Sequence, residues 1–279
     1  MAERQKNVVY FGHHKSGSRF FRTEVFPKFA QLNGRDVFRY EIKGTFVYDT
    51  IHDLDLHNID FEAWAATEGA VLMLCNAGAP IVELIDGLGV DYVGVHLFRD
   101  PRQLLVSNYL DHLKRHNVIS PVGWHWTKLE QDRPILEELS AEDGMIYELD
   151  NITKDIFDNQ LRAWRGGDHI LEFKLEEFSP DPATAQSNIE KIGAFCGFET
   201  MPEADLARTF SNGFAQHDWR ELFTPKLHEK FLVEYGEMTA AMGYSNEDHL
   251  SAVNQFGAAH SIAAAERAKM DALAIKGSG

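Results

Sequence analysis

The chain has 279 residues, is 44% hydrophobic and carries a formal net charge of −16 at pH 7. This length and composition provide a sizeable core for one α/β domain, or for one domain with a helical annex. The negative charge argues against a nucleic-acid-binding protein, which normally has a basic surface. An anionic ligand would therefore need a local basic pocket that opposes the overall electrostatic field.

Three further features indicate the compartment. The two cysteines, Cys75 and Cys196, each lie inside an apolar run, so we expect buried thiols and no disulfide. The first residues resemble neither a secretory signal nor a transit peptide. No apolar stretch reaches the roughly 18 residues that a membrane span needs. We expect a soluble protein of a reducing cytoplasm.

Strand and helix patterns alternate along most of the chain. In chain order we expect a strand at Lys6–Phe11, a helix at Ser18–Leu32, a strand at Asp36–Ile42, a helix at Phe61–Glu68, a strand at Ala70–Cys75, a helix at Ile81–Leu88, a strand at Tyr92–Phe98, helices at Gln103–His116 and Ala141–Arg165, a strand at His169–Phe173, and helices at Pro182–Cys196 and Lys226–Met242. This order predicts an α/β protein with a mostly parallel sheet flanked by helices. In such sheets ligands bind at the carboxyl ends of the strands.

Two segments fall outside this alternation. Residues 117–140 look irregular, which predicts an inserted, mobile surface segment. The tail at 247–279 is rich in Ala and is either a docked helix or partly free. Since no repeat or interdomain linker is visible, we expect one domain over residues 1–279, with its core at about 7–244.

The loop after the first strand has a composition suited to an anion. It reads Gly-His-His-Lys-Ser-Gly-Ser-Arg over residues 12–19 and precedes the first helix. Backbone N–H groups and the helix dipole favour negative charge at such a loop. Gly17 allows close approach of a ligand, the hydroxyls of Ser16 and Ser18 can donate, and Lys15 and Arg19 add charge. These residues suit a phosphate or sulfate group.

An ordinary strand-to-helix loop with Ser18 as helix N-cap is the alternative interpretation. A Walker A loop is excluded, because Lys15 precedes Gly17 by two residues and no second glycine stands at the required position. An ordinary P-loop kinase is therefore not expected.

A second stretch, His96–Tyr109, reads HLFRDPRQLLVSNY. Arg99 ends a strand and Ser107 lies about two turns into the next helix, so both side chains could converge on one anion, with Arg102 nearby. The alternative is a capped helix with a solvated arginine, which Asp100 followed by Pro101 also fits.

Together these stretches resemble the sulfotransferase family that uses 3′-phosphoadenosine-5′-phosphosulfate (PAPS). In that family a Lys-Ser/Thr-Gly-Ser/Thr-Thr loop binds the 5′-phosphosulfate, and an Arg with a Ser eight residues later binds the 3′-phosphate. Residues 170–198 and the segment Asp218–Thr224 (DWRELFT) are similar to two further family motifs. The resemblance spans about residues 7–244. It implies a P-loop-NTPase-like three-layer sulfotransferase fold, with adenosine 3′,5′-bisphosphate (PAP) as product and no metal.

The resemblance also implies which residues bind the nucleotide. They are His14, Lys15, Ser16, Gly17, Ser18, Arg19 and Phe20 in the first loop, Arg99 and Ser107 in the second stretch, and Asn212 and Gly213 in a late loop. His13 is expected to be structural. Three departures stand out: Arg19 replaces a frequent Thr, Phe20 replaces a frequent Trp beside the adenine, and Ser211-Asn212-Gly213 lacks the family's Arg-Lys pair. Arg208 or Arg220 could compensate for the missing charge.

The catalytic base is the main open point. By analogy with phosphoryl transfer, Lys15 would stabilise the bridging oxygen of the leaving nucleotide. Cytosolic family members use a histidine just after the third strand, where residues 75–80 here contain none. Glu41 is the nearest equivalent of a glutamate used by other members, and His52 and His57 are the other catalytic candidates. Each could instead be a solvated surface residue, and a metal site built on His52 and His57 is disfavoured.

We therefore expect an enzyme that moves a sulfuryl group from PAPS to a hydroxyl or amine of a small-molecule, lipid or sugar acceptor. The alternative is a non-catalytic nucleotide- or partner-binding protein with a sulfotransferase fold; a nucleotide kinase with a degenerate phosphate loop is a third. Trp124, His125 and Trp126 either form an acceptor lid or pack the insert onto the core. We expect no nucleic-acid partner and no membrane span; a homodimer is compatible with the sequence.

Overall fold

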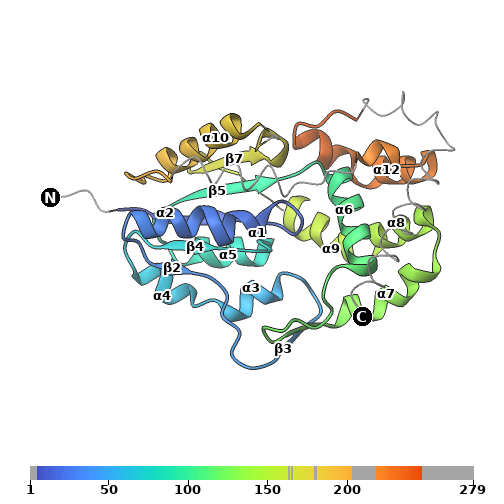
Figure 1. Cartoon of the computed structure of the whole chain (residues 1–279), viewed down its shortest axis with the longest axis horizontal. Coiled ribbons are helices and arrows are strands. Elements are labelled where there is room, and N and C mark those ends of the chain that lie inside the picture. The colour runs from blue at the N-terminus through green and yellow to red at the C-terminus, as the bar shows by residue number, and fades with distance from the viewer. Residues whose placement is uncertain (1–4, 163, 165, 179–180, 203–217, 247–279) are drawn as a thin grey trace.

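A five-stranded parallel sheet forms the centre of the molecule (Figure 1). The computed structural model describes residues 5–162, 164, 166–178, 181–202 and 218–246. The strand order is β2-β4-β1-β5-β7, and each neighbouring pair runs parallel. The strands are β1 (Asn7–Phe11), β2 (Val37–Phe38), β4 (Val71–Met73), β5 (Tyr92–Phe98) and β7 (Ile170–Lys174). The predicted α/β class with a parallel sheet is confirmed.

Helices cover both faces of this sheet. Because side chains alternate along a strand, Val8 and Tyr10 of β1 face one apolar core, while Val9 and Phe11 face another. The first core is completed by the helical stretch α1 (Ser18–Phe20), η1 (Phe21–Val25), α2 (Phe26–Leu32), and by α10 (Pro182–Phe195). The second is completed by α4 (Phe61–Ala66) and α5 (Ala79–Gly87). The central strands β1, β4 and β5 are thus buried on both sides, as is typical of parallel sheets, while the edge strands β2 and β7 are partly exposed.

A third core lies beyond the carboxyl end of the sheet, among the helices on the right of Figure 1. These helices are α6 (Pro101–Lys114), α7 (Thr127–Glu138), α8 (Ala141–Asp150), α9 (Ile152–Asp155) and α12 (Pro225–Ala241), with the π-helical turn η2 (Ile156–Arg162) after α9. Two short 3₁₀ segments, η3 (Leu175–Phe178) and η4 (Trp219–Glu221), follow β7 and precede α12 respectively. Among the described residues, no helix is both long and apolar enough to cross a membrane.

The insert is more regular than its sequence suggests. Residues 117–140 were expected to be irregular, but Trp124–Trp126 forms β6, which pairs in parallel with β3 (Phe46–Tyr48), and helix α7 follows. Trp126 is 1% exposed, and its Nε1 donates to the carbonyl of Asp49 at 2.9 Å. The prediction of an irregular segment was therefore wrong, because a buried indole fixes the insert to a distant part of the chain.

Three other elements differ from expectation. The segment Asp53–Asn58, for which no helix was expected, is helix α3, and β2 has only two of the residues expected in a longer strand. The helix expected at 141–165 is divided into α8, α9 and η2. The break falls at Asn151, whose backbone leaves the helical region and whose side-chain amide donates to Tyr147 O at 2.8 Å. The tail at 247–279 lies outside the described residues.

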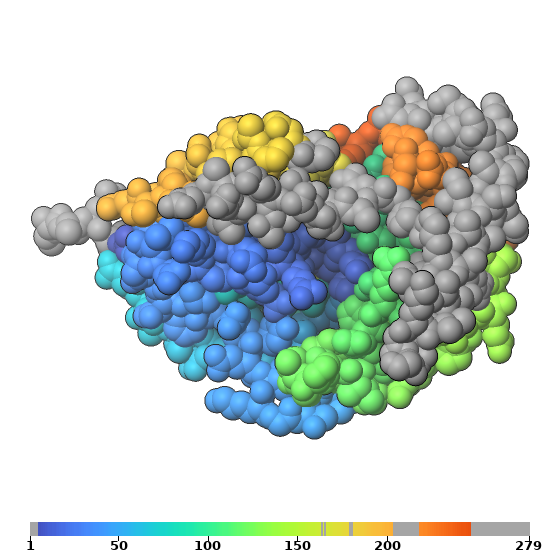
Figure 2. Space-filling model, viewed as in Figure 1, coloured from blue at the N-terminus to red at the C-terminus, as the bar shows by residue number. Residues whose placement is uncertain are grey.

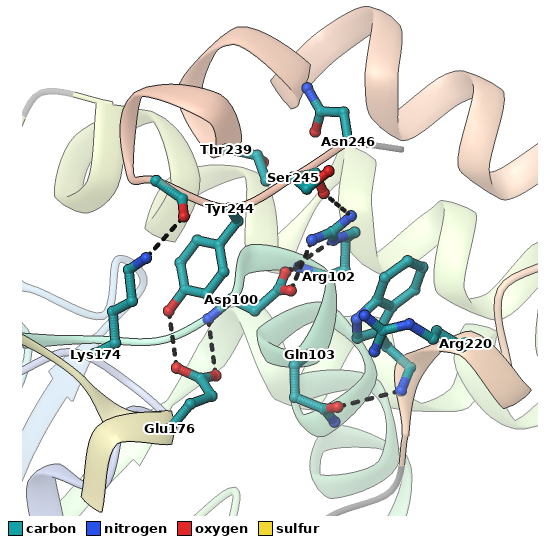
Figure 3. Close-up of polar contacts among 12 residues, drawn as sticks. Asp100, Arg102, Gln103, Lys174, Glu176, Arg220, Thr239, Tyr244, Ser245 and Asn246 are labelled. Atoms are coloured by element: carbon teal, nitrogen blue, oxygen red, sulfur yellow. Dashed lines mark hydrogen bonds and ion pairs between the residues drawn. The ribbon is translucent and has the colours of Figure 1, made fainter. Parts of the chain in front are cut away.

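A buried arginine ties the start of α6 to the end of the described chain (Figure 3). Arg102 is 1% exposed and makes a two-point contact with Asp100, at 2.9 Å through Nε and 2.8 Å through Nη2. Its Nη1 donates to Ser245 O at 2.8 Å, and its guanidinium lies 4.2 Å from the centre of the Trp219 ring. A buried charge is stable only with such partners.

We expect Arg102→Ala to lower the free energy of unfolding by about 3–5 kcal/mol, because it leaves Asp100 buried without its partner. Urea denaturation measures the loss. Arg220→Ala is the matched control: Arg220 also lies over Trp219, at 4.8 Å, but pairs with the half-exposed Asp218. Its cost should stay below about 1 kcal/mol. Equal costs for the two variants would contradict this assignment.

Candidate anion-binding site

A cavity of about 830 Å³ opens where β1, β4 and β5 end. Figure 2 shows the surface hollowed between the blue N-terminal segments and the green segments that follow β5. The lining combines the loop after β1, residues just beyond β4 and β5, one side of α6 and the β3–β6 region. The lining residues are His14, Lys15, Gly17, Ser18, Arg19, Phe20, Arg22, Thr23, Glu24, Tyr40, Tyr48, Ile51, Leu54, Cys75, Asn76, Arg99, Ser107, Asp111, Arg115, His116, Asn117 and Trp124.

The cavity is locally basic although the protein is acidic. Five of its lining residues are cationic and two are acidic; they are Lys15, Arg19, Arg22, Arg99 and Arg115 against Glu24 and Asp111. The whole chain has a net charge of −16. Positive charge collected in a concave site focuses the local potential and favours an anionic ligand there.

The loop after β1 adopts a backbone suited to binding. Lys15 has φ 58° and Gly17 has φ 77°, and Lys15 is the one non-glycine residue with positive φ in the described part of the chain. Gly17 occupies the N-cap position of α1 without any side-chain cap, and Ser18 is the first helical residue. The alternative in which Ser18 caps the helix is therefore not what forms. A strained non-glycine turn of this kind is typical of functional sites.

The two predicted anion-binding stretches meet through the backbone of Lys15. Nη1 of Arg99, just beyond the end of β5, donates to the carbonyl of Lys15 at 3.3 Å. Arg99 is 6% exposed, and burial lowers the pKa of its guanidinium, while Glu176, Asp100 and Tyr244 nearby oppose that shift. Arg99 thus supports the loop and contributes to the cavity wall.

An acidic residue faces the catalytic candidate Lys15. The Lys15 Nζ lies 2.8 Å from Oδ2 of Asp111, and both side chains are mostly buried. Asp111 is on α6, one turn after Ser107. A ligand sulfate or phosphate would compete with this carboxylate for the ammonium group of Lys15.

Most of the predicted nucleotide-binding residues line the cavity. They are His14, Lys15, Gly17, Ser18, Arg19, Phe20, Arg99 and Ser107. Ser16 is fully buried and is not part of the lining. Asn212 and Gly213, like Arg208, lie outside the described residues. Arg220 pairs with Asp218 at 3.3 Å, and Arg102 is occupied by Asp100, so neither lines the cavity.

The three candidates for the catalytic base lie away from the lining. Glu41 is exposed, and His57 is an exposed residue of α3, 3.9 Å from Asp53. His52 lies 3.5 Å from Asp155, and this contact raises the pKa of the His52 imidazole. None of the three borders the cavity in this structure. Their catalytic role stays a prediction.

Sequence reasoning missed a chain of polar side chains behind the cavity. Nε2 of His14 lies 3.2 Å from Nε2 of His112, and Nδ1 of His112 lies 2.7 Å from Oε1 of Glu148. His116 also lines the cavity, two residues beyond the last residue of α6. The spacing of His112 and His116 after Ser107 is visible in the sequence, whereas nothing local identifies Glu148.

Another part of the cavity lining is aromatic and apolar. It includes Tyr40, Tyr48, Ile51, Leu54 and Trp124. Trp124 therefore contributes to the wall while Trp126 packs in the core, so the lid and packing interpretations each describe one of the two indoles. Such a surface suits an organic molecule with few charges.

A buried carboxylate holds the backbone of two cavity-lining residues in place. Oδ2 of Asp55 accepts from the backbone N–H of Cys75 at 2.6 Å and of Asn76 at 2.7 Å. Burial raises the pKa of Asp55 to about 6, although both hydrogen bonds oppose the shift. The loop after β4 is thus fixed by α3, and Cys75 and Asn76 are presented to the cavity.

Three side chains here are close enough to consider a metal ion. His14, Asp111 and His116 each have a ligand atom within 4.8 Å of the other two. Two of them are already engaged, since Lys15 contacts Asp111 and His112 contacts His14. A cation would have to displace the ammonium group of Lys15, so we assign this cluster to the anion site.

Comparison with known proteins gives distant structural similarities. No protein-family model matches the chain, and no curated protein matches it. Among solved structures, it is similar to mouse sulfotransferase SULT7A1 complexed with PAP, with a TM-score of 0.47 and 14% identity over 87% of this chain and 90% of that chain. At this distance the similarity assigns neither family nor activity, and the cavity itself has to support any function.

We expect Asp111→Asn to strengthen the binding of inorganic pyrophosphate by about fivefold, close to 1 kcal/mol, because the variant removes a carboxylate that competes for Lys15. Isothermal titration calorimetry measures the change. Glu24→Gln is the control, since Glu24 lines the cavity but is exposed, and its effect should stay below about twofold. Unchanged or weaker binding by Asp111→Asn would contradict the assigned competition.

Proposed function

We propose that this protein is a PAPS-dependent sulfotransferase with a P-loop-like fold, and that the cavity binds the nucleotide. The observation that carries the proposal is the basic cavity at the ends of β1 and β5, in a chain of net charge −16, with Lys15 and Arg99 joined by a hydrogen bond. Ligands of parallel α/β sheets bind at this edge.

The loop after β1 would hold the 5′-phosphosulfate. Gly17 lets the backbone approach the ligand, and the hydroxyl of Ser18 and the charges of Lys15 and Arg19 face the same cavity. Lys15 would neutralise negative charge that develops on the bridging oxygen as the S–O bond of the donor breaks. To do so, the ammonium group of Lys15 must separate from Asp111. The ion pair with Asp111 keeps this ammonium group beside the cavity.

The 3′-phosphate would lie against Arg99 and Ser107. Both line the cavity, from the end of β5 and from α6 respectively, and the end of β5 is held in place by Asp100, Arg102 and Glu176. A rigid, partly desolvated arginine suits planar, two-point recognition of a phosphate. Discrimination between nucleotides with and without a 3′-phosphate therefore follows from Arg99.

The aromatic wall would hold the acceptor. Tyr40, Tyr48 and Trp124 provide apolar contact for a small molecule, a lipid or a sugar face. The acceptor hydroxyl or amine would attack the sulfur in line with the departing nucleotide. Hydrophobic and aromatic contacts here would set acceptor preference, and the charged side of the cavity would set donor preference.

We expect PAP to bind with micromolar affinity and AMP to bind far more weakly, as measured by calorimetry. In Arg99→Ala, the affinity for PAP should fall by about 1.5–3 kcal/mol, roughly 10- to 150-fold, while that for AMP stays nearly unchanged. Equal affinity of the wild-type protein for PAP and AMP would refute the 3′-phosphate assignment. Absence of binding to either nucleotide would remove the donor site from the proposal.

We expect Lys15→Ala to lower the rate of sulfuryl transfer from PAPS by about 10²–10³-fold, since one donor to the developing charge is lost. Its PAP affinity should fall by only about fivefold. The readout is transfer of labelled sulfate from PAPS to a panel of phenols, alcohols, amines and sugars. Lys28→Ala is the control, because Lys28 is exposed on α2 and lies outside the cavity lining.

Two results would overturn this role. A near-normal rate in Lys15→Ala would show that another group stabilises the leaving nucleotide. PAP binding without transfer to any acceptor of the panel would favour the alternative of a non-catalytic nucleotide-binding protein.

A further inference from the structure

A histidine next to Lys15 connects the cavity to a carboxylate in the protein interior. His14 lines the cavity, and its Nε2 lies 3.2 Å from Nε2 of His112 on α6. The two rings are stacked, with centroids 5.2 Å apart. Since His112 engages Nε2, the other ring nitrogen of His14, Nδ1, is left for a different partner.

Glu148 on α8 lies at the buried end of this series of side-chain contacts. Both His112 and Glu148 have fully buried side chains, and Nδ1 of His112 lies 2.7 Å from Oε1 of Glu148. The same oxygen accepts a hydrogen bond from Oγ1 of Thr153 at 2.8 Å, and Thr153 in turn accepts from Nδ2 of Asn108 at 2.9 Å. An ionised carboxylate buried this deeply needs a protonated partner or shared proton to be stable.

We propose that Glu148, His112 and His14 form a proton relay, in which His14 Nδ1 takes the proton of the acceptor during sulfuryl transfer. This inference rests on the proposed function, and it names the catalytic base that the sequence did not identify. His14 would be the catalytic residue, and His112 and Glu148 would be positioning residues that act through it.

The proton balance of the step follows from the observed contacts. In the resting form His112 donates Nδ1–H to Glu148, and His14 donates Nε2–H to His112, so Nδ1 of His14 has a free lone pair. The acceptor O–H or N–H bond breaks, and its proton goes to Nδ1 of His14. The Nε2 proton of His14 passes to His112, and the acceptor forms its bond to sulfur as the S–O bond to the nucleotide breaks. The gained proton completes an ion pair between His112 and Glu148.

The surroundings of His14 keep it ready for this role. It faces Lys15 on its own loop, Asp111 and His112 on α6, His116 just after that helix, and through His112 the carboxylate of Glu148 on α8. Burial, then His112, His116 and Lys15, hold the pKa of His14 well below its usual value. The imidazole is therefore unprotonated near neutral pH, and a proton gained at Nδ1 is stabilised chiefly by the carboxylate at the far end of the chain.

The neighbouring residue provides a matched internal control. Nε2 of His13 lies 2.6 Å from Nε2 of His96, and Nδ1 of His96 lies 3.2 Å from Oε1 of Glu172. This second chain has the same atom pattern, but His13 is fully buried outside the cavity lining and Glu172 is 44% exposed. It can stabilise the loop, but it has no access to an acceptor.

The relay predicts a specific protonation pattern, which ¹⁵N NMR of histidine-labelled wild-type protein can read without any substrate. We expect His14 at pH 7.5 to carry its proton on Nε2, with the Nδ1 signal at the unprotonated position; His14→Gln assigns the signal. In Glu148→Gln, His14 should gain a proton at a lower pH than in the wild-type protein, because the opposite charge is lost. In His112→Phe, His14 should become a mixture of tautomers.

His96→Gln is the control, and it should leave the His14 signal and its titration unchanged. A wild-type His14 with the proton on Nδ1, or one whose titration ignores Glu148→Gln, would overturn the relay. PAP calorimetry on the same samples separates the two proposals. Absence of PAP binding counts against the proposed function, whereas normal PAP binding with the wrong tautomer counts against the relay alone.

Discussion

The hydrogen bond from Arg99 to the carbonyl of Lys15 holds together the two strand ends on which the site depends. Each strand end alone is an ordinary connection in a parallel sheet. Their contact makes the left-handed turn at Lys15 part of the cavity wall, and brings positive charge from the ends of β1 and β5 to one place. A strained backbone persists only when its surroundings over-determine it, and here a buried guanidinium supplies part of that support.

The rest of the fold can be understood as support for Arg99. Asp100 N–H donates to Glu176 at 3.1 Å, and Tyr244 OH donates to the other oxygen of Glu176 at 2.8 Å (Figure 3). Arg102 then joins Asp100 to Ser245. Segments distant in the sequence are thereby fixed around the start of α6. This rigidity matters because a phosphate-binding arginine gains affinity when its position is set before the ligand arrives.

The local pattern of apolar and polar residues in the sequence predicted much of this architecture. The strand at Tyr92–Phe98 was expected at the same residues, since a run of apolar residues ends abruptly at Arg99 and Asp100. The helix expected at Ser18–Leu32 is present, though its second turn is π-helical, which no local signal indicates. The β3–β6 pair was missed because its stability comes from Trp126 packing against distant residues. Strands this short carry little periodicity of their own.

In the candidate site, too, local sequence identifies some residues, while the relation of others depends on tertiary packing. Lys15, Gly17 and Arg99 are identified by their positions after strands, which are features of the local sequence. His112 and Glu148 could not be identified in this way, because their relation to His14 exists only after α6 and α8 pack together. The predicted Asn212 and Gly213 lie outside the described residues, and their role remains a prediction.

The histidine pair shows how burial separates chemical roles that composition leaves equal. His13 and His14 are neighbours, and each contacts a second histidine that contacts a glutamate. His13 is fully buried, and its contacts end at the partly exposed carboxylate of Glu172, where water can compensate charge. The contacts of His14 lead from the cavity to the carboxylate of Glu148, which has no solvent exposure. Only the second arrangement places the effect of a fully buried charge on a histidine that lines the cavity, and electrostatic interactions strengthen as water is excluded.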